Sequence, residues 1–120
     1  MKIWICVLLM MGLVVGEARA EMPADLAADG QAALARGAAW LAAQQQADGH
    51  WGSPETPALT ALAMWALHRA NPAEYQDAIA RAMVYVLTSV HEDGSIWRAP
   101  SMERRGGGLA NYNTAVCMSA

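Results

Sequence analysis

The apolar residues of this chain recur mainly at helical spacing. Over residues 24–47 they form one stripe, made up of Leu26, Leu34, Ala38 and Leu41. Such a stripe predicts a helix with one buried face. Two glycines within it lower helix propensity, so we expect the helix to begin near Asp29 rather than near Pro23. The Asp48-Gly49 turn then ends it, because glycine adopts the left-handed conformation found at helix ends.

A second helix is expected to start at Thr56 and Pro57 and to end at Asn71. Threonine can cap a helix, and proline suits the first helical position. Apolar side chains cover most of its surface, namely Leu59, Leu62, Ala63, Met64, Trp65, Ala66 and Leu67. We therefore expect this helix to be more buried than the first.

A third helix follows at once. Asn71 and Glu74 form the pattern of a capping box, and Asp93-Gly94 ends the helix. Its stripe consists of Ile79, Met83, Val86, Leu87 and Val90. A glycine-rich loop then precedes a fourth helix that begins near Asn113. These patterns predict an all-α chain.

Residues 36–52 recur 45 positions later, so the helical hairpin is the unit to interpret. The recurring pairs are Arg36 and Arg81, Trp40 and Tyr85, Asp48 and Asp93, Gly49 and Gly94, and Trp51 and Trp97, the last with one residue inserted. The second and fourth helices also match, through Thr60 and Thr114. We expect one repeat at about 24–70 and a second at about 71–120 that breaks off within its second helix.

The first twenty residues have the pattern of a signal peptide. A lysine precedes a helical apolar run over residues 3–15, and residues 18–20 read Ala-Arg-Ala, a small-x-small cleavage pattern. A run of thirteen residues is too short for a bilayer core of about 30 Å, so no stable membrane anchor is expected. The sequence predicts a protein that is exported, periplasmic or secreted, and that begins at Glu21.

The segment after this leader is acidic and lacks obvious chemistry. Six arginines and ten acidic residues give it a net charge of −4, which disfavours nucleic acid as a partner. Cys117 is its one cysteine, so no internal disulfide forms. The three histidines, His50, His68 and His91, have no ligand-type residue at a convincing spacing. We expect neither a metal nor a cofactor.

The first copy of the repeat resembles the glutamine-tryptophan motif of squalene-hopene cyclases. The matching residues are Arg36, Gly37, Trp40, Leu41, Gln45, Gly49 and Trp51. More broadly the unit resembles the prenyltransferase and squalene oxidase repeat of terpenoid cyclases and protein prenyltransferases. This resemblance implies an α-α toroid built from helical hairpins. The second copy departs from the motif, with Val90 for the glutamine and Ile96 at the tryptophan position.

The motif has a physical interpretation of its own. Gln45, near a helix end, can bond to free backbone groups there, and Trp51 can cover that amide and pack beneath the next hairpin. A solvated Gln45 and a Trp51 that is ordinary core remain the alternative. For the second copy this alternative is equally favoured, because Val90 cannot make the bond.

The catalytic signatures that the resemblance implies are missing from the sequence. The chain has no Asp-x-Asp-Asp run and no zinc set, and Cys117 is followed by Met118 rather than by the Gly-Glu-Gln of a thioester site. We therefore expect a non-catalytic segment with a structural or binding role. Its partners would be the remaining repeats of a larger toroid, a polypeptide or an apolar ligand.

Two alternatives stay open. The chain can be the N-terminal part of a cyclase-like or prenyltransferase-like enzyme whose catalytic residues lie beyond residue 120. It can also be a binding module for an apolar ligand or a polypeptide, with Met64, Trp65 and Tyr112 lining the cavity.

The leader makes a direct prediction. Protein recovered from the exported fraction of cells that express the full sequence should begin at Glu21, because cleavage follows Ala20. Intact-mass measurement checks this. Exported protein that still carries Met1 would contradict it.

Overall fold

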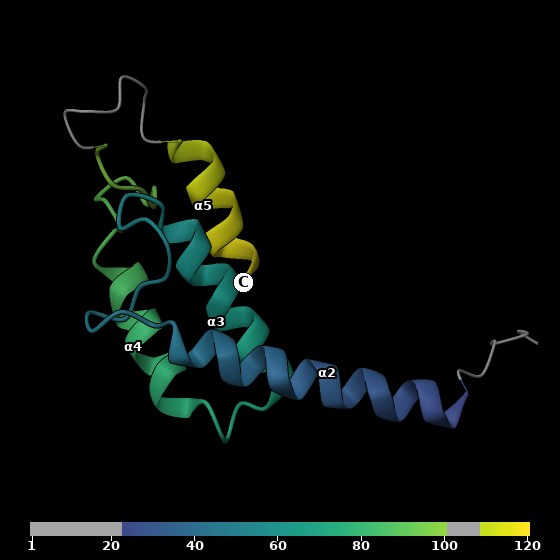
Figure 1. Cartoon of the computed structure of the whole chain (residues 1–120). Coiled ribbons are helices and arrows are strands. Elements are labelled where there is room, and N and C mark those ends of the chain that lie inside the picture. Colours follow the sequence, from purple (N-terminus) through teal and green to yellow (C-terminus); the bar gives the residue numbers. More distant parts are fainter. Residues whose placement is uncertain (1–22, 101–108) are drawn as a thin grey trace, which may run out of the picture.

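The computed structural model describes residues 23–100 and 109–120. They form four α-helices: α2 (Ala24–Ala43), α3 (Pro57–Ala70), α4 (Gln76–Leu87) and α5 (Ala110–Ser119), shown in Figure 1. An isolated antiparallel bridge joins Val90 and Ile96, and no strand forms within these ranges. The all-α prediction is therefore confirmed for this part of the chain. The expected signal peptide lies outside the described residues.

Helix α3 is the centre of the arrangement, because α2, α4 and α5 all pack against it. The core joins residues of α2, α3 and α4 with one side chain from the first turn. Its members are Ala38, Trp51, Ala63, Met64, Leu67, Ala78 and Ala82. As expected, α3 buries many more of its residues than α2 does. The N-terminal half of α2 extends beyond the other helices (Figure 1).

The helix boundaries differ from the sequence prediction in three places. Helix α2 already begins at Ala24 rather than near Asp29, because its many alanines offset the low propensity of the two glycines within it. Helix α4 begins only at Gln76. Only half of the expected capping box forms, because the Glu74 N–H donates to Asn71 Oδ1 at 3.3 Å while the Asn71 N–H bonds to the Leu67 carbonyl oxygen, and the bond lies in a turn that precedes the helix. Helix α5 begins at Ala110, three residues earlier than expected.

The buried faces of the helices are formed by small residues rather than by the large apolar stripes. Helix α4 buries Ala78 and Ala82 together with Tyr85 and Val86, while Met83 and Leu87 are exposed. The prediction that Met83 and Leu87 belong to a buried stripe is thus wrong. Alanines at a contact let two backbones approach closely, and the larger side chains on the adjacent face then remain outside.

Helix α2 follows the same rule. It buries Ala38, whereas Leu26 and Leu34 of the expected stripe are exposed. In α3 the side chains of Leu62 and Trp65 are also nearly half exposed. Several large apolar residues of this fold therefore lack a packing partner among the described residues.

The two Asp-Gly turns share one backbone arrangement. In each, three hydrogen bonds recur at the 45-residue offset. In the first turn they run from Gln46 N to His50 O (2.9 Å), from Gly49 N to Gln46 O (2.9 Å) and from His50 N to Asp48 Oδ1 (3.4 Å). In the second they run from His91 N to Ser95 O (2.8 Å), from Gly94 N to His91 O (2.9 Å) and from Ser95 N to Asp93 Oδ1 (2.9 Å).

A threonine of the following helix then fixes each turn. Thr60 Oγ1 of α3 accepts a hydrogen bond from Trp51 N (3.1 Å), and Thr114 Oγ1 of α5 accepts one from Ile96 N (2.8 Å). The backbone of Ile96, and not that of Trp97, thus takes the place of Trp51. The inserted residue follows the shared turn.

The glycines of the two turns form a matched pair for mutation. Both have positive φ, 96° at Gly49 and 82° at Gly94, but a Cβ on Gly49 would lie 2.5 Å from the Arg81 carbonyl oxygen. A Cβ on Gly94 would meet no described atom within 4 Å. Gly94→Ala should lower the free energy of unfolding by about 1 kcal/mol, and Gly49→Ala by roughly 3 kcal/mol, because steric overlap adds to the strain. Urea denaturation measures both, and equal losses would contradict the close approach.

Candidate functional site

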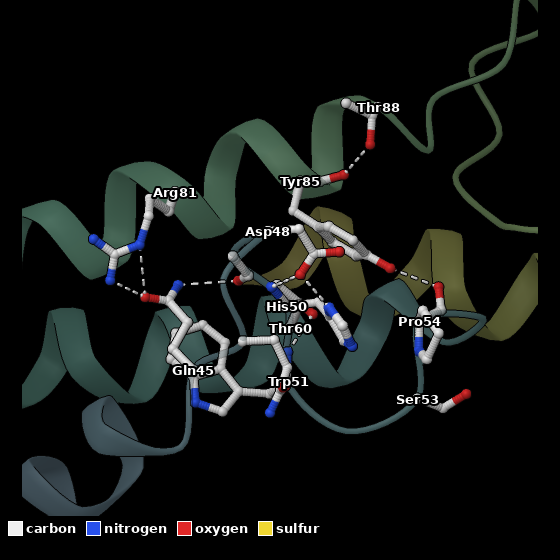
Figure 2. Close-up of polar contacts among 12 residues, drawn as sticks. Gln45, Asp48, His50, Trp51, Ser53, Pro54, Thr60, Arg81, Tyr85 and Thr88 are labelled. Carbon is white, nitrogen blue, oxygen red and sulfur yellow. Dashed lines mark hydrogen bonds and ion pairs between the residues drawn. The ribbon is translucent and has the colours of Figure 1, made fainter.

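The side chain of Gln45 joins the first turn to α4. Its Nε2 donates to the carbonyl oxygens of Gly49 (3.0 Å) and Ala78 (2.9 Å). Its Oε1 accepts two hydrogen bonds from Arg81, one from Nε at 3.1 Å and one from Nη2 (Figure 2). Both donor hydrogens and both lone pairs of the amide are thus used. Gln45 is bonded to protein groups on two helical hairpins and is not merely solvated.

The carbonyl groups that accept hydrogen bonds from Gln45 differ from those expected. The sequence suggested free backbone groups at a helix end, yet Ala78 lies within α4 and Gly49 within the turn. A helical carbonyl can accept a second hydrogen bond because it has two lone pairs. The amide therefore holds the side of a helix, and this fixes where α4 lies along the turn.

Arg81 contributes to the same junction through its backbone. Its carbonyl group lies directly over Gly49, where any side chain on the glycine would overlap with it. Its guanidinium group bonds to Gln45. The arginine of the second repeat thus binds the glutamine of the first, a pairing that the order of residues within one motif does not show.

Trp51 lies in the core and also closes the end of α2. Its indole Nε1 donates to the Leu41 carbonyl oxygen at 2.7 Å, while its backbone N–H is held by Thr60. The Leu41 carbonyl oxygen also accepts a hydrogen bond from Gln44 N (3.1 Å), so the indole uses its second lone pair. Trp51 is 5% exposed and belongs to the core cluster.

Tyr85 packs on the far side of the same turn. Its hydroxyl donates to the Pro54 carbonyl oxygen at 2.6 Å, and its ring stacks on His50 with the ring centres 5.2 Å apart. The Arg98 guanidinium lies 4.3 Å from the ring centre, a cation–π contact. Burial raises the pKa of the Tyr85 phenol. A hydrogen bond from the His50 side chain lowers the pKa of Asp48.

The second turn keeps its backbone but lacks this junction. Val90 stands where Gln45 does, and it is exposed. Trp97 lies against His91, with ring centres 4.7 Å apart, and its Nε1 donates to Ser95 Oγ at 3.2 Å. Trp97 therefore does not close a helix end as Trp51 does. Hydrogen bonds from Ser95 lower the pKa of Asp93.

Three of the motif residues lie apart from the junction. Arg36, Gly37 and Trp40 are exposed on α2, and Trp40 is 65% exposed, although its counterpart Tyr85 is 4% exposed. The positions of Gly37 and Trp40 are thus open in the first repeat and buried in the second, where Ala82 and Tyr85 occupy them, while Arg36 and Arg81 are both exposed.

One buried polar residue was not found from the sequence. Asn113 of α5 is 1% exposed, and its Oδ1 accepts a hydrogen bond from Ala58 N at the start of α3 (3.2 Å). It supplies the cap that Thr56 was expected to give, since Thr56 makes no side-chain cap bond. The first repeat has Leu59 at the matching position, so a comparison of the two repeats does not reveal the role of Asn113.

The residues proposed to line an apolar cavity are separated. Met64 is buried in the core, while Trp65 and Tyr112 are about half exposed. Trp65 lines an open pocket of about 570 Å³ beside α2 and another of about 270 Å³, shared with Leu62 and Val116, between α3 and α5.

No group of three histidine, cysteine or carboxylate side chains among the described residues could hold a metal. Burial raises the pKa of the Cys117 thiol, which makes it a poor nucleophile at neutral pH. None of the helices described is both long and apolar enough to cross a membrane.

Comparisons with models of protein families, with curated proteins and with solved structures find no match to this chain. Its function must therefore be argued from the junction and from the exposed faces.

Two neighbouring glutamines test the junction. Gln45→Ala removes four hydrogen bonds and should lower the free energy of unfolding by about 2 kcal/mol. Gln46→Ala is the control, because the exposed Gln46 side chain bonds only to the nearby Gln44 carbonyl oxygen at 3.3 Å, and its loss should stay within about 0.5 kcal/mol. Urea denaturation compares them. Similar values for both variants would show that the junction adds no stability.

Proposed function

We propose that the chain is a non-catalytic structural unit of a helical-repeat assembly, an exported part of an α-α toroid of the prenyltransferase and squalene oxidase repeat type. The observation that carries this proposal is the junction of Gln45, Gly49 and Arg81. It joins one hairpin to the next through residues that occupy repeated positions. A contact built this way can be extended by further hairpins.

The packing of the helices supports the proposal. The second helices of the two hairpins, α3 and α5, lie against each other, and α4 packs on α3 (Figure 1). In a toroid of hairpins the second helices form the inner layer and the first helices form the outer one. The arrangement of α3, α4 and α5 is compatible with a short arc of such a toroid.

The exposed apolar side chains support it as well. They lie on all four helices and include Leu34, Trp40, Trp65, Leu87 and Met118. Large apolar side chains exposed together are typical of surfaces that contact another macromolecule. In repeat proteins each unit buries such faces against its neighbours.

Binding of an apolar ligand is a second candidate, favoured by one observation. The pocket of about 270 Å³ between α3 and α5 is lined by Leu62, Trp65, Ala115 and Val116. These belong to the helices that would face the centre of a toroid. The pocket is slightly smaller than common ligand sites of about 300–1,000 Å³. The alternative of an isoprenoid enzyme is supported by the sequence resemblance alone.

Dye binding tests the proposed role. Protein isolated from cells that express the full sequence should be folded by circular dichroism and should strongly increase the fluorescence of a hydrophobic dye, because its apolar faces are uncovered. Trp40→Gln should lower this signal, since Trp40 is the most exposed tryptophan among the described residues. Folded protein that leaves the dye unaffected would contradict the proposal.

The same measurement separates the two candidates. A long-chain isoprenoid should displace the dye only if a ligand pocket exists, and detergent alone should not. Trp65→Gln would then abolish displacement, whereas a structural unit shows no selective displacement.

A further inference from the structure

Helix α2 carries a copy of the face that α4 uses to pack on the first turn. At the 45-residue offset Ala33, Arg36, Gly37 and Trp40 correspond to Ala78, Arg81, Ala82 and Tyr85. In α4, Ala78 bonds to the Gln45 amide and the Arg81 backbone lies over Gly49. Ala82 lies in the core, and the Tyr85 hydroxyl bonds to Pro54. The four residues of α2 are all exposed. We name residues 33, 36, 37 and 40 the α2 face.

The second turn offers the matching open surface. Gly49 is buried under the Arg81 carbonyl group, whereas Gly94, which has the same left-handed backbone, has no described atom within 4 Å of its would-be Cβ. Ala99 follows the turn and lines an open pocket of about 400 Å³ together with His91 and Trp97. We name residues 90–99 the second-turn surface.

We propose that the α2 face of one copy of the chain docks on the second-turn surface of another copy. In this contact the Arg36 carbonyl group would lie over Gly94, as that of Arg81 lies over Gly49. Trp40 would lie against Ser95, as Tyr85 lies against its counterpart His50. The inference rests on the proposed structural role, and it names the partner and the surface.

Charge selects a second copy as the occupant. Arg36 is the one charged residue between positions 30 and 47, so it sets the charge of the α2 face. In the second-turn surface Val90 cannot bind an arginine as Gln45 does, but Glu92 and Asp93 are exposed beside it. Asp93 already accepts two hydrogen bonds from Ser95, so Glu92 is the carboxylate that would face Arg36. Such a pair sets the register of a contact more than its strength.

The contact is heterologous, because it joins two different surfaces of the same chain. Each pair of docked copies keeps one open α2 face and one open second-turn surface. Repetition of such a contact closes into a ring or continues as a filament, depending on the rotation between copies.

Charge reversal tests the proposal in solution. Wild-type protein should self-associate reversibly in sedimentation velocity runs over a range of concentrations. Arg36→Glu would place two carboxylates together in the contact, and Glu92→Arg would place two arginines together, so each should weaken association at least about tenfold. An equimolar mixture of the two variants should associate again, because the α2 face of the Glu92→Arg variant and the second-turn surface of the Arg36→Glu variant both keep their original charges. Circular dichroism verifies that each variant is folded.

Arg69→Glu is the control, because Arg69 is likewise an exposed helical arginine but lies outside both surfaces. It should associate like the wild type. Association that neither reversal weakens, or a mixture that does not regain it, would overturn the proposed contact. A folded wild-type monomer that still binds the hydrophobic dye would also overturn it while leaving the structural role intact. A monomer that does not bind the dye would overturn both.

Discussion

The carboxamide of Gln45 is the interaction on which the arrangement of the two hairpins depends. Its four hydrogen bonds connect the end of α2, the first turn and α4. These bonds hold α4 in a single position along the first turn. In that position the Arg81 carbonyl group lies over Gly49. Glycine is needed there for two reasons at once, its positive φ and the close approach of a backbone. Tyr85 then reaches Pro54 and His50 from the same helix.

The close approach of the helices also explains the large apolar surface. Because α4 meets its neighbours through Ala78 and Ala82, Met83 and Leu87 on the adjacent face remain exposed. The small apolar residues therefore hold the hairpins together, and the large apolar residues stay available for other contacts. A repeat unit needs both, one for its own fold and one for its neighbours. The charge and the shape of the open surfaces then determine which neighbour fits.

The turns of the two repeats share a backbone conformation but differ in the contacts of their side chains. Both turns have the same hydrogen bonds and the same threonine contact. Only the first has a glutamine that binds the first helix of the next hairpin, α4, and a tryptophan that bonds to the end of the preceding helix, α2. After the second turn Arg98 bonds instead to Thr88 and Ser89 and covers Tyr85. Because Val90 stands at the position of Gln45, the second turn lacks the side-chain bond with which the first turn holds the next hairpin.

The sequence by itself determined the helices and the turns to within a few residues, because these follow from local patterns such as Pro57 at the start of α3 and the glycines at repeated turn positions. It also indicated Gln45 and Trp51 as special, through the motif. Only the tertiary structure decided which face each helix buries and which groups Gln45 and Trp51 bind. Those outcomes depend on close backbone approach and on hydrogen bonds between residues distant in sequence, such as Asn113 with Ala58. Helical periodicity identifies large apolar side chains, but here alanines and a glycine define the contacts, and their small size is an advantage only once a second backbone is present.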